Sequence, residues 1–242
     1  MDRRGIIKGA LALGTTLGAA LALPARLPAQ VRSGNPRDAM LAEIAKREQQ
    51  KAGSILWRTD VVGIADYGLH SAEPRFHFVN LDAGRVDSYL VTHGAGSDPE
   101  HEGWLNWFSN VPESLCSSRG AYMTYGWYTG QFGTSIRLEG LEADNSNALD
   151  RAIVMHRADY AEPAHVARWG RLGRSNGCFA MGEVQFKRAL LELGGGRVLF
   201  ADRLGLAADG STVAPPQQIA GEIRPLGPEP ARGEDILNPG VY

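Results

Sequence analysis

The stretch RFHFVNLDAGRVDSYLVT, residues 75–92, contains the most informative pattern for the fold. Residues 75–81 and 86–92 are rich in aromatic and β-branched side chains, and the Asp-Ala-Gly at residues 82–84 between them is a hairpin turn signal. The stretch therefore predicts two antiparallel strands joined by a tight turn.

Short segments of the same kind recur along the chain, separated by glycine and aspartate. They predict strands at residues 55–57, 61–67, 121–125, 135–138, 152–156 and 197–201. A series of short strands with frequent turns is typical of a sandwich or barrel. We therefore expect a mainly β fold with short flanking helices.

Two helices are expected beside these strands. The first opens at Asn35-Pro36, where an N-cap residue precedes proline, and ends before residue 53; we expect it to pack on the outside of the main domain. The second spans residues 183–193 and is stopped by the three glycines that follow it. The charges at residues 43–51, together with Arg75 and Arg85, are interpreted as a solvated face.

The first 29 residues have the anatomy of an export signal. A basic start with Arg3 and Arg4 precedes a short apolar run at residues 9–23, and small residues and prolines follow. The run is too short for a membrane span, and the paired arginines resemble a twin-arginine signal, with an ordinary secretory signal as the alternative. We expect an exported protein of the periplasm or cell envelope, with no stable membrane span after processing.

Processing would also change the charge of the chain. Removal of residues 1–29 takes away four basic side chains and one acidic one, so the net charge goes from −2 to −5. An acidic protein is a poor partner for nucleic acid. We expect a helix and linker at residues 30–53, one catalytic domain at residues 54–205, and a proline-rich tail at residues 206–242. Nothing in the sequence predicts the oligomeric state.

The chemistry is expected at Cys178. This residue ends the segment Gly-Arg-Ser-Asn-Gly-Cys at residues 173–178, and His156 stands 22 residues before it at the end of a predicted strand. A cysteine framed by Ser and Gly, with a base nearby, is what a thiol nucleophile needs. The backbone N–H groups of the Ser-Asn-Gly at residues 175–177 could face a developing oxyanion, and Arg174 adds positive charge nearby.

These residues resemble the L,D-transpeptidases, bacterial wall enzymes with a YkuD-type catalytic domain. The signature of that family is a histidine on a strand followed by Ser-x-Gly-Cys, and the Gly-Arg-Ser-x-Gly-Cys form is similar to a murein L,D-transpeptidase subgroup. The resemblance covers roughly residues 61–202 and includes the segments 109–110, 117–122, 128–130, 135–142 and 151–156. It implies an L,D-transpeptidase-type β-sandwich or barrel, and we expect no cofactor and no metal.

The resemblance also implies roles for single residues. Cys178 would be the nucleophile, His156 its base, and the main-chain carbonyl of Arg157 the group that holds the imidazole, with the Asp159 side chain as an alternative. The oxyanion donors would be the backbone N–H groups of Asn176, Gly177 and Cys178. Ser175 would shape that turn or assist proton movement.

Three positions depart from the family pattern: Arg157 replaces a small residue, Phe179 stands where the subgroup often has Pro, and Ala180 stands where the wider family often has Arg. We therefore assign contact with a substrate carboxylate to Arg174. Tyr122 and His93 are added as further substrate-binding candidates.

The implied reaction has two halves. A peptidoglycan tetrapeptide stem is cleaved before its terminal D-alanine to give a thioester, and an amine of a second stem then forms a cross-link between third-position diamino acids. An L,D-carboxypeptidase or endopeptidase, with water as acceptor, shares the same site and stays open as an alternative.

Other interpretations remain. His93, Asp98, Glu100 and His101 would suggest a zinc-dependent wall protein, but they lie in a turn-rich loop without an H-E-x-x-H helix. A non-catalytic wall protein is a further alternative. A disulfide between Cys116 and Cys178 would abolish activity, and only the folded distance decides it. Four aromatic residues are interpreted as core or lid, with a substrate groove as the alternative: Trp104, Trp107, Trp127 and Tyr128.

Overall fold

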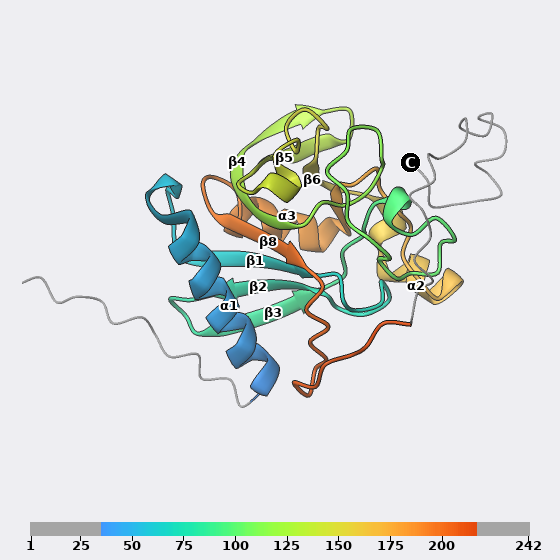
Figure 1. Cartoon of the computed structure of the whole chain (residues 1–242), viewed down its shortest axis with the longest axis horizontal. Helices are drawn as coiled ribbons and strands as arrows, with labels where there is room; N and C mark the ends of the chain where they lie inside the picture. The colour runs from blue at the N-terminus through green and yellow to red at the C-terminus, as the bar shows by residue number, and fades with distance from the viewer. Residues whose placement is uncertain (1–34, 217–242) are drawn as a thin grey trace, which may run out of the picture.

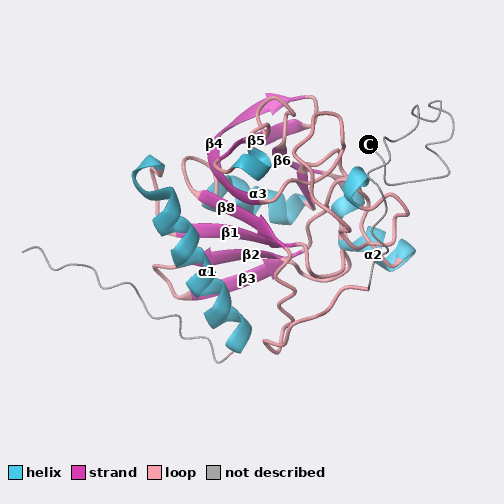
Figure 2. Cartoon of the chain, in the orientation of Figure 1, coloured by secondary structure: helices cyan, strands magenta, loops and turns pink. Residues whose placement is uncertain are grey.

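The computed structural model describes residues 35–216, so the predicted export signal and the tail beyond residue 216 lie outside the described residues. Within this range the strands form one curled sheet in the order β3-β2-β1-β8-β4-β5-β6-β7 (Figures 1 and 2). The strands are β1 Val61–Asp66, β2 Phe76–Asn80, β3 Arg85–Tyr89, β4 Gly120–Gly130, β5 Gly133–Gly140, β6 Val154–Arg157, β7 Phe179–Met181 and β8 Val198–Asp202. The predicted mainly β fold with flanking helices is confirmed.

The helix α1, Pro36–Ala52, crosses one face of the sheet (Figure 1). Asn35 caps it, because its side-chain oxygen accepts the N–H of Arg37 at 3.0 Å. Leu41 is fully buried in a cluster with Val62 and Ile64 of β1. Burial of one leucine contributes roughly 2 kcal/mol, so this contact ties the helix firmly to the sheet. Among residues 35–216, no helix has the length and apolar character that crossing a bilayer requires.

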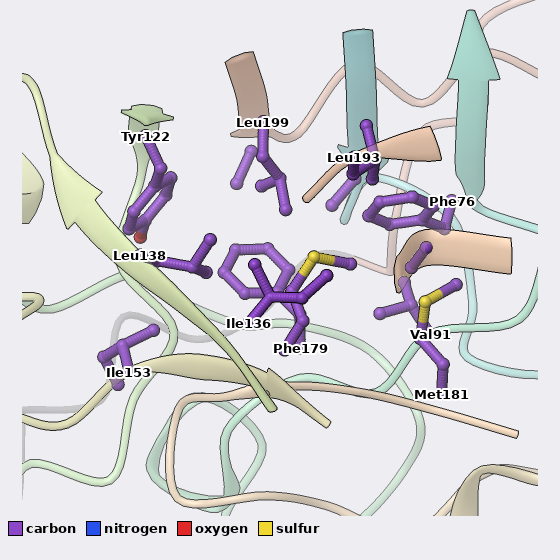
Figure 3. Packing of buried hydrophobic residues seen from close by; sticks show 14 of the residues in the cluster. Phe76, Val91, Tyr122, Ile136, Leu138, Ile153, Phe179, Met181, Leu193 and Leu199 are labelled. Atoms are coloured by element: carbon purple, nitrogen blue, oxygen red, sulfur yellow. The ribbon is translucent and has the colours of Figure 1, made fainter. Parts of the chain in front are cut away.

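The other face of the sheet packs against α3, Glu183–Glu192. Side chains of β1 alternate between the two faces, with Val61 and Ala65 in the cluster that α3 covers and Val62 and Ile64 in the cluster that α1 covers. The strand is therefore buried on both sides and carries a continuous apolar run. Figure 3 shows the larger cluster, which includes Phe76, Tyr122, Ile136, Phe179 and Leu193.

The strand predictions are mostly confirmed, with one error. Residues 55–57 are not a strand: Gly53–Ile55 is a 3₁₀ turn, and the N–H groups of Trp57 and Arg58 both donate to the carbonyl of Gly196. The helix α2, Pro163–Trp169, and strand β7 were not predicted. Three residues are too few for β7 to show an alternating pattern.

The prediction of a solvated face is wrong at two charged residues. Arg75 is fully buried, and its guanidinium donates to the carbonyls of Val91 at 3.0 Å and Leu69 at 2.9 Å. Glu48 is also fully buried and binds the exposed cation of Lys51 at 3.1 Å. Both charges are buried because a partner compensates the lost hydration, which a pattern of sequence charges does not reveal.

The described part of the predicted tail is attached to the sheet. The carboxylate of Asp66, at the end of β1, accepts the N–H groups of Gly205 and Leu206, each at 2.7 Å. Leu206 and Thr212 then form an isolated β-bridge. The start of this segment, at Leu206, is therefore held on the sheet, and the chain turns back so that the N–H of Val213 donates to the carbonyl of Gly205.

Candidate active site

The strands β6 and β7 are adjacent at one edge of the sheet and run parallel, with Met155 opposite Phe179 and His156 opposite Ala180. Met155 and Phe179 point into the core that α3 covers, so alternation directs His156 to the other face. Cys178 directly precedes β7, and the same alternation directs it to the face of His156. The register therefore places the predicted nucleophile and base on one face of two neighbouring strands.

Ser175 holds the turn that leads to Cys178. Its Oγ donates to the carbonyl of Cys178 at 2.6 Å and accepts the N–H of Gly177 at 3.2 Å. Its own backbone N–H donates to the carbonyl of His93 at 2.9 Å. The side chain is buried, and these contacts fix the conformation of the turn.

The three backbone N–H groups that were predicted as oxyanion donors differ in their partners. The N–H of Gly177 donates to Ser175, whereas those of Asn176 and Cys178 donate to no other residue in the range 35–216. Gly177 has φ +106°, and a Cβ there would lie 2.6 Å from the carbonyl oxygen of Cys116. Only glycine fits this position, and the turn leaves two N–H groups able to bind a negative oxygen.

His156 is almost fully buried and is held through Nδ1 and through one face of its ring. Its Nδ1 lies 3.0 Å from the carbonyl oxygen of Arg157, and since a carbonyl only accepts, Nδ1 carries the proton and Nε2 keeps a lone pair. The ring of Phe132 stacks on the imidazole. Burial lowers the pKa of His156, and the bond to Arg157 opposes that shift. The carboxylate of Asp159 binds the Arg157 guanidinium and not the imidazole.

Cys178 is also buried, and burial raises the pKa of its thiol to about 11. The backbone N–H of Val154 and the positive charge of Arg151 act in the opposite direction. The thiol donates to the carbonyl of Ala152 at 3.7 Å. Cys116 and Cys178 are both free, so the nucleophile is not blocked by a disulfide in this structure.

A row of buried polar side chains supports the turn. The guanidinium of Arg75 donates to Nδ1 of His93 at 2.7 Å, and Nε2 of His93 donates to Asp98 at 3.1 Å. Burial lowers the pKa of His93 to about 4, which keeps the ring neutral. Burial alone would raise the pKa of Asp98, but the bond from His93 holds it below its ordinary value. Because the carbonyl of His93 receives the N–H of Ser175, this row anchors the turn.

The predicted substrate contacts are buried in this structure. Arg174 donates to the carbonyls of Asp98 and Pro99, the latter at 3.1 Å, and its Nε has no partner among the described residues. Tyr122 lies within the core, and its hydroxyl bonds to Ser118 at 2.7 Å (Figure 3). Together with the buried ring of His93, these side chains underlie the site and do not line its surface.

The alternative metal cluster is divided between separate partners. His93 pairs with Asp98, whereas Nε2 of His101 lies 2.9 Å from the carbonyl of Leu172. Across residues 35–216, no three His, Cys, Asp or Glu side chains are grouped so as to hold a metal ion.

Two residues of the site were not predicted, Phe132 and Arg151. Phe132 lies in the two-residue connection between β4 and β5, where Gly130 and Gly133 are a hairpin signal that was available in the sequence. Arg151 donates to the carbonyls of Ser109 and Cys116 and approaches the turn at Gly177. No local sequence pattern predicts the role of Arg151, because its partners are far away in the sequence.

Comparison with known proteins identifies the family to which this domain belongs. The family model described as the L,D-transpeptidase catalytic domain matches residues 36–201, which is more than half of the 242-residue chain. No curated protein sequence matches the chain.

Two solved structures are similar to part of it. An L,D-transpeptidase from Mycobacterium smegmatis has 14% sequence identity and a TM-score of 0.35, covering 59% of this chain and 58% of its own. An L,D-transpeptidase from Mycobacterium tuberculosis H37Rv has 14% identity and a TM-score of 0.38, covering 59% of this chain and 57% of its own. The chain thus spans less than two thirds of either structure, and the family is assigned from the sequence match. The chain belongs to the L,D-transpeptidase catalytic domain family.

Proposed function

We propose that this protein is a peptidoglycan L,D-transpeptidase in which Cys178 is the nucleophile and His156 is its base. One observation carries the proposal: the parallel register of β6 and β7 puts both side chains on one face, and the Arg157 carbonyl leaves Nε2 of His156 as a proton acceptor. A thiol with an oriented base and two open N–H donors is equipped for acyl transfer.

The first half-reaction is acylation. The Cys178 proton moves to Nε2 of His156, and the sulfur attacks the carbonyl carbon that precedes the terminal D-alanine of the donor stem. The carbonyl oxygen takes the negative charge and is bound by the N–H groups of Asn176 and Cys178. His156 then gives its proton to the leaving amine, the C–N bond breaks, and free D-alanine departs. The donor stem stays bound to Cys178 as a thioester.

The second half-reaction returns the enzyme to its starting state. The amine of an acceptor stem attacks the thioester carbonyl and loses a proton to His156. The C–S bond then breaks, and the sulfur leaves as thiolate and recovers the proton. The product is a cross-link between third-position diamino acids; with water in place of the amine, the product is a tripeptide.

The test is incubation of residues 30–242 with disaccharide-tetrapeptide, followed by mass spectrometry of both products and protein. A cross-linked dimer together with an acyl adduct on Cys178 supports the proposal. Tripeptide as the sole product would assign the hydrolase instead of the transferase. Absence of any adduct on Cys178 would contradict its role as nucleophile.

Matched variants separate the chemistry from the fold. Cys178→Ala and His156→Gln should each abolish product formation, whereas Cys116→Ser, which removes the other thiol, should keep it. Equal loss in Cys116→Ser would mean that the measured activity does not depend on one specific cysteine.

We also infer that the protein is exported to the periplasm or cell envelope through the twin-arginine route. The basis is the Arg3-Arg4 pair ahead of a short apolar run. Replacement of both arginines by lysine should leave the protein in the cytoplasmic fraction. Unchanged export of that variant would favour an ordinary secretory signal.

A further inference from the structure

Arg151 joins the nucleophile turn to a distant loop. Its Nη1 donates to the carbonyl of Ser109 at 2.8 Å, and its Nη2 donates to the carbonyl of Cys116. The same Nη2 would lie 3.2 Å from a Cβ at Gly177, one residue before Cys178. The guanidinium is therefore held in place against the backbone that carries the thiol.

This cation has no acidic partner in the described part of the chain. None of the ion pairs between residues 35 and 216 includes Arg151, although Arg188 and Arg197 each pair with carboxylates. The groups whose charge acts on Arg151 are Tyr122, Cys116 and Cys178, and burial lowers its pKa below the ordinary value. A partly buried guanidinium that binds only carbonyls retains an uncompensated positive charge.

The other titratable groups around Cys178 are neutral at neutral pH. Burial raises the pKa of Tyr67 and of Tyr122 above the usual range, and it raises the pKa of Cys116. Burial lowers the pKa of His156, so the resting imidazole is uncharged. Among the described residues, Arg151 is the charged group that acts on the Cys178 thiol.

We propose that Arg151 is the resident cation that stabilises the thiolate of Cys178, and that it does so as a positioning residue which exchanges no proton. Deprotonation leaves the electron pair on sulfur, whether the proton moves to Nε2 of His156 during turnover or to solvent base in the free enzyme. The fixed guanidinium lowers the energy of that new negative charge. The inference rests on the proposed role of Cys178 and identifies which group makes its ionisation accessible.

The geometry explains why the cation is fixed by carbonyls and not by a carboxylate. A carboxylate partner would cancel the field at the sulfur, whereas two neutral carbonyls restrain the guanidinium and keep its charge. The absence of a side chain at Gly177 lets the guanidinium approach the turn closely. Any added side chain there would meet Cys116 and Arg151 together.

The test measures the ionisation of Cys178 without relying on turnover. In the Cys116→Ser background, the rate of iodoacetamide alkylation of Cys178 is measured from pH 7 to pH 9.5, where the rate follows the thiolate fraction. Arg151→Gln should alkylate about tenfold more slowly at every pH, since a nearby opposite charge shifts a pKa by about 1 unit or more. Arg151→Lys should recover most of the rate.

The matched control is Arg85→Gln. Arg85 is an exposed arginine on β3, at the opposite edge of the sheet from β7. In the Arg85→Gln variant, Cys178 should be alkylated at the parental rate. A folded Arg151→Gln variant, with unchanged circular dichroism and parental alkylation rates, would overturn the proposal.

A second measurement tests the role of Arg151 even if the Arg151→Gln variant does not fold. His156→Gln should lose tetrapeptide turnover but keep alkylation within about threefold of the parent, because the resting imidazole is neutral. An alkylation rate that drops tenfold in this variant would make the imidazole the stabilising cation and overturn the role of Arg151. Turnover and alkylation test different claims. If Cys178→Ala did not abolish turnover, the proposed function would be contradicted, whereas the alkylation rate of Cys178 tests the role of Arg151 alone.

Discussion

The ring of Phe132 stacks on the imidazole of His156, with centroids 4.3 Å apart and planes inclined by 15°. Phe132 comes from the tip of the β4–β5 hairpin, and Ser135 of β5 pairs with His156 across the sheet. The hairpin therefore folds its own tip back over the strand beside it. The aromatic ring covers the base and contributes to the burial that lowers the pKa of His156.

Phe132→Ala should expose the imidazole and reduce its desolvation. The pKa of His156 then rises toward its ordinary value, so the acid limb of the kcat/KM profile moves to higher pH. We expect about a tenfold loss of kcat/KM at neutral pH from lost ring orientation. Phe132→Tyr keeps the stacking and should retain the parental profile. An acid limb that stays in place in Phe132→Ala would contradict this account.

Acid should destabilise the fold through buried histidines. Burial lowers the pKa of His77 to about 3 and the pKa of His93 to about 4, below the value of 6.5 for an exposed histidine. Below pH 6.5 the unfolded chain binds protons that the folded chain excludes, so the free energy of unfolding falls as the pH drops toward 4. Each histidine contributes up to roughly 2 kcal/mol of loss at pH 5.

Urea unfolding at pH 7 and pH 5 checks this slope. His77→Gln should show a smaller loss between the two pH values than the parent. His165→Gln, at a partly exposed position, should match the parent. Equal slopes for all three proteins would rule out His77 as a source of acid sensitivity.

Gly177→Ala should disable the nucleophile turn. The new Cβ would meet the carbonyl oxygen of Cys116 at 2.6 Å, and the backbone has φ +106°. We expect at least about a hundredfold loss of turnover, because a displacement of about 1 Å at a catalytic group is that costly. Gly195→Ala is the matched control: its φ is +86°, nothing lies within 4 Å, and it should lose about 1 kcal/mol of stability while retaining activity.

Leu41→Ala tests whether α1 is part of the same folded unit as the sheet. Leu41 is fully buried and packs on β1, so its truncation should lower the free energy of unfolding by about 3 kcal/mol. Met40→Ala, at the neighbouring residue with 42% exposure, should change it by less than about 0.5 kcal/mol. The comparison is made by urea denaturation, and similar values for the two variants would show that α1 contributes little.

Local chemistry made much of the site predictable. Cys178 and the Ser-Asn-Gly before it are contiguous, and the apolar run before His156 predicts the strand that delivers it. The hairpin at residues 75–92 was equally visible, because its turn and both strands are local.

Contacts between distant residues account for what the sequence did not reveal. The charge of Arg75 is an ordinary surface feature until the carbonyls of Leu69 and Val91 surround it. A turn replaces the strand predicted at residues 55–57, and it is held by the bond from the N–H of Trp57 to the carbonyl of Gly196, 139 residues later. Tyr122 belongs to a strand that was predicted, but only the packed sheet shows that its ring faces the core (Figure 3).

The central position of β8 has a consequence for how the chain is made. This strand is the last one within residues 35–216, yet it lies between β1 and β4: Leu199 pairs with Gly63 on one side and with Tyr122 on the other. Until residues 198–202 have been synthesised, the two halves of the sheet have no strand between them, and the contacts that join them are among the longest in sequence. A chain cut short before Val198 would carry two apolar strand edges open to other molecules, so premature termination yields an aggregation-prone product and not a shortened enzyme.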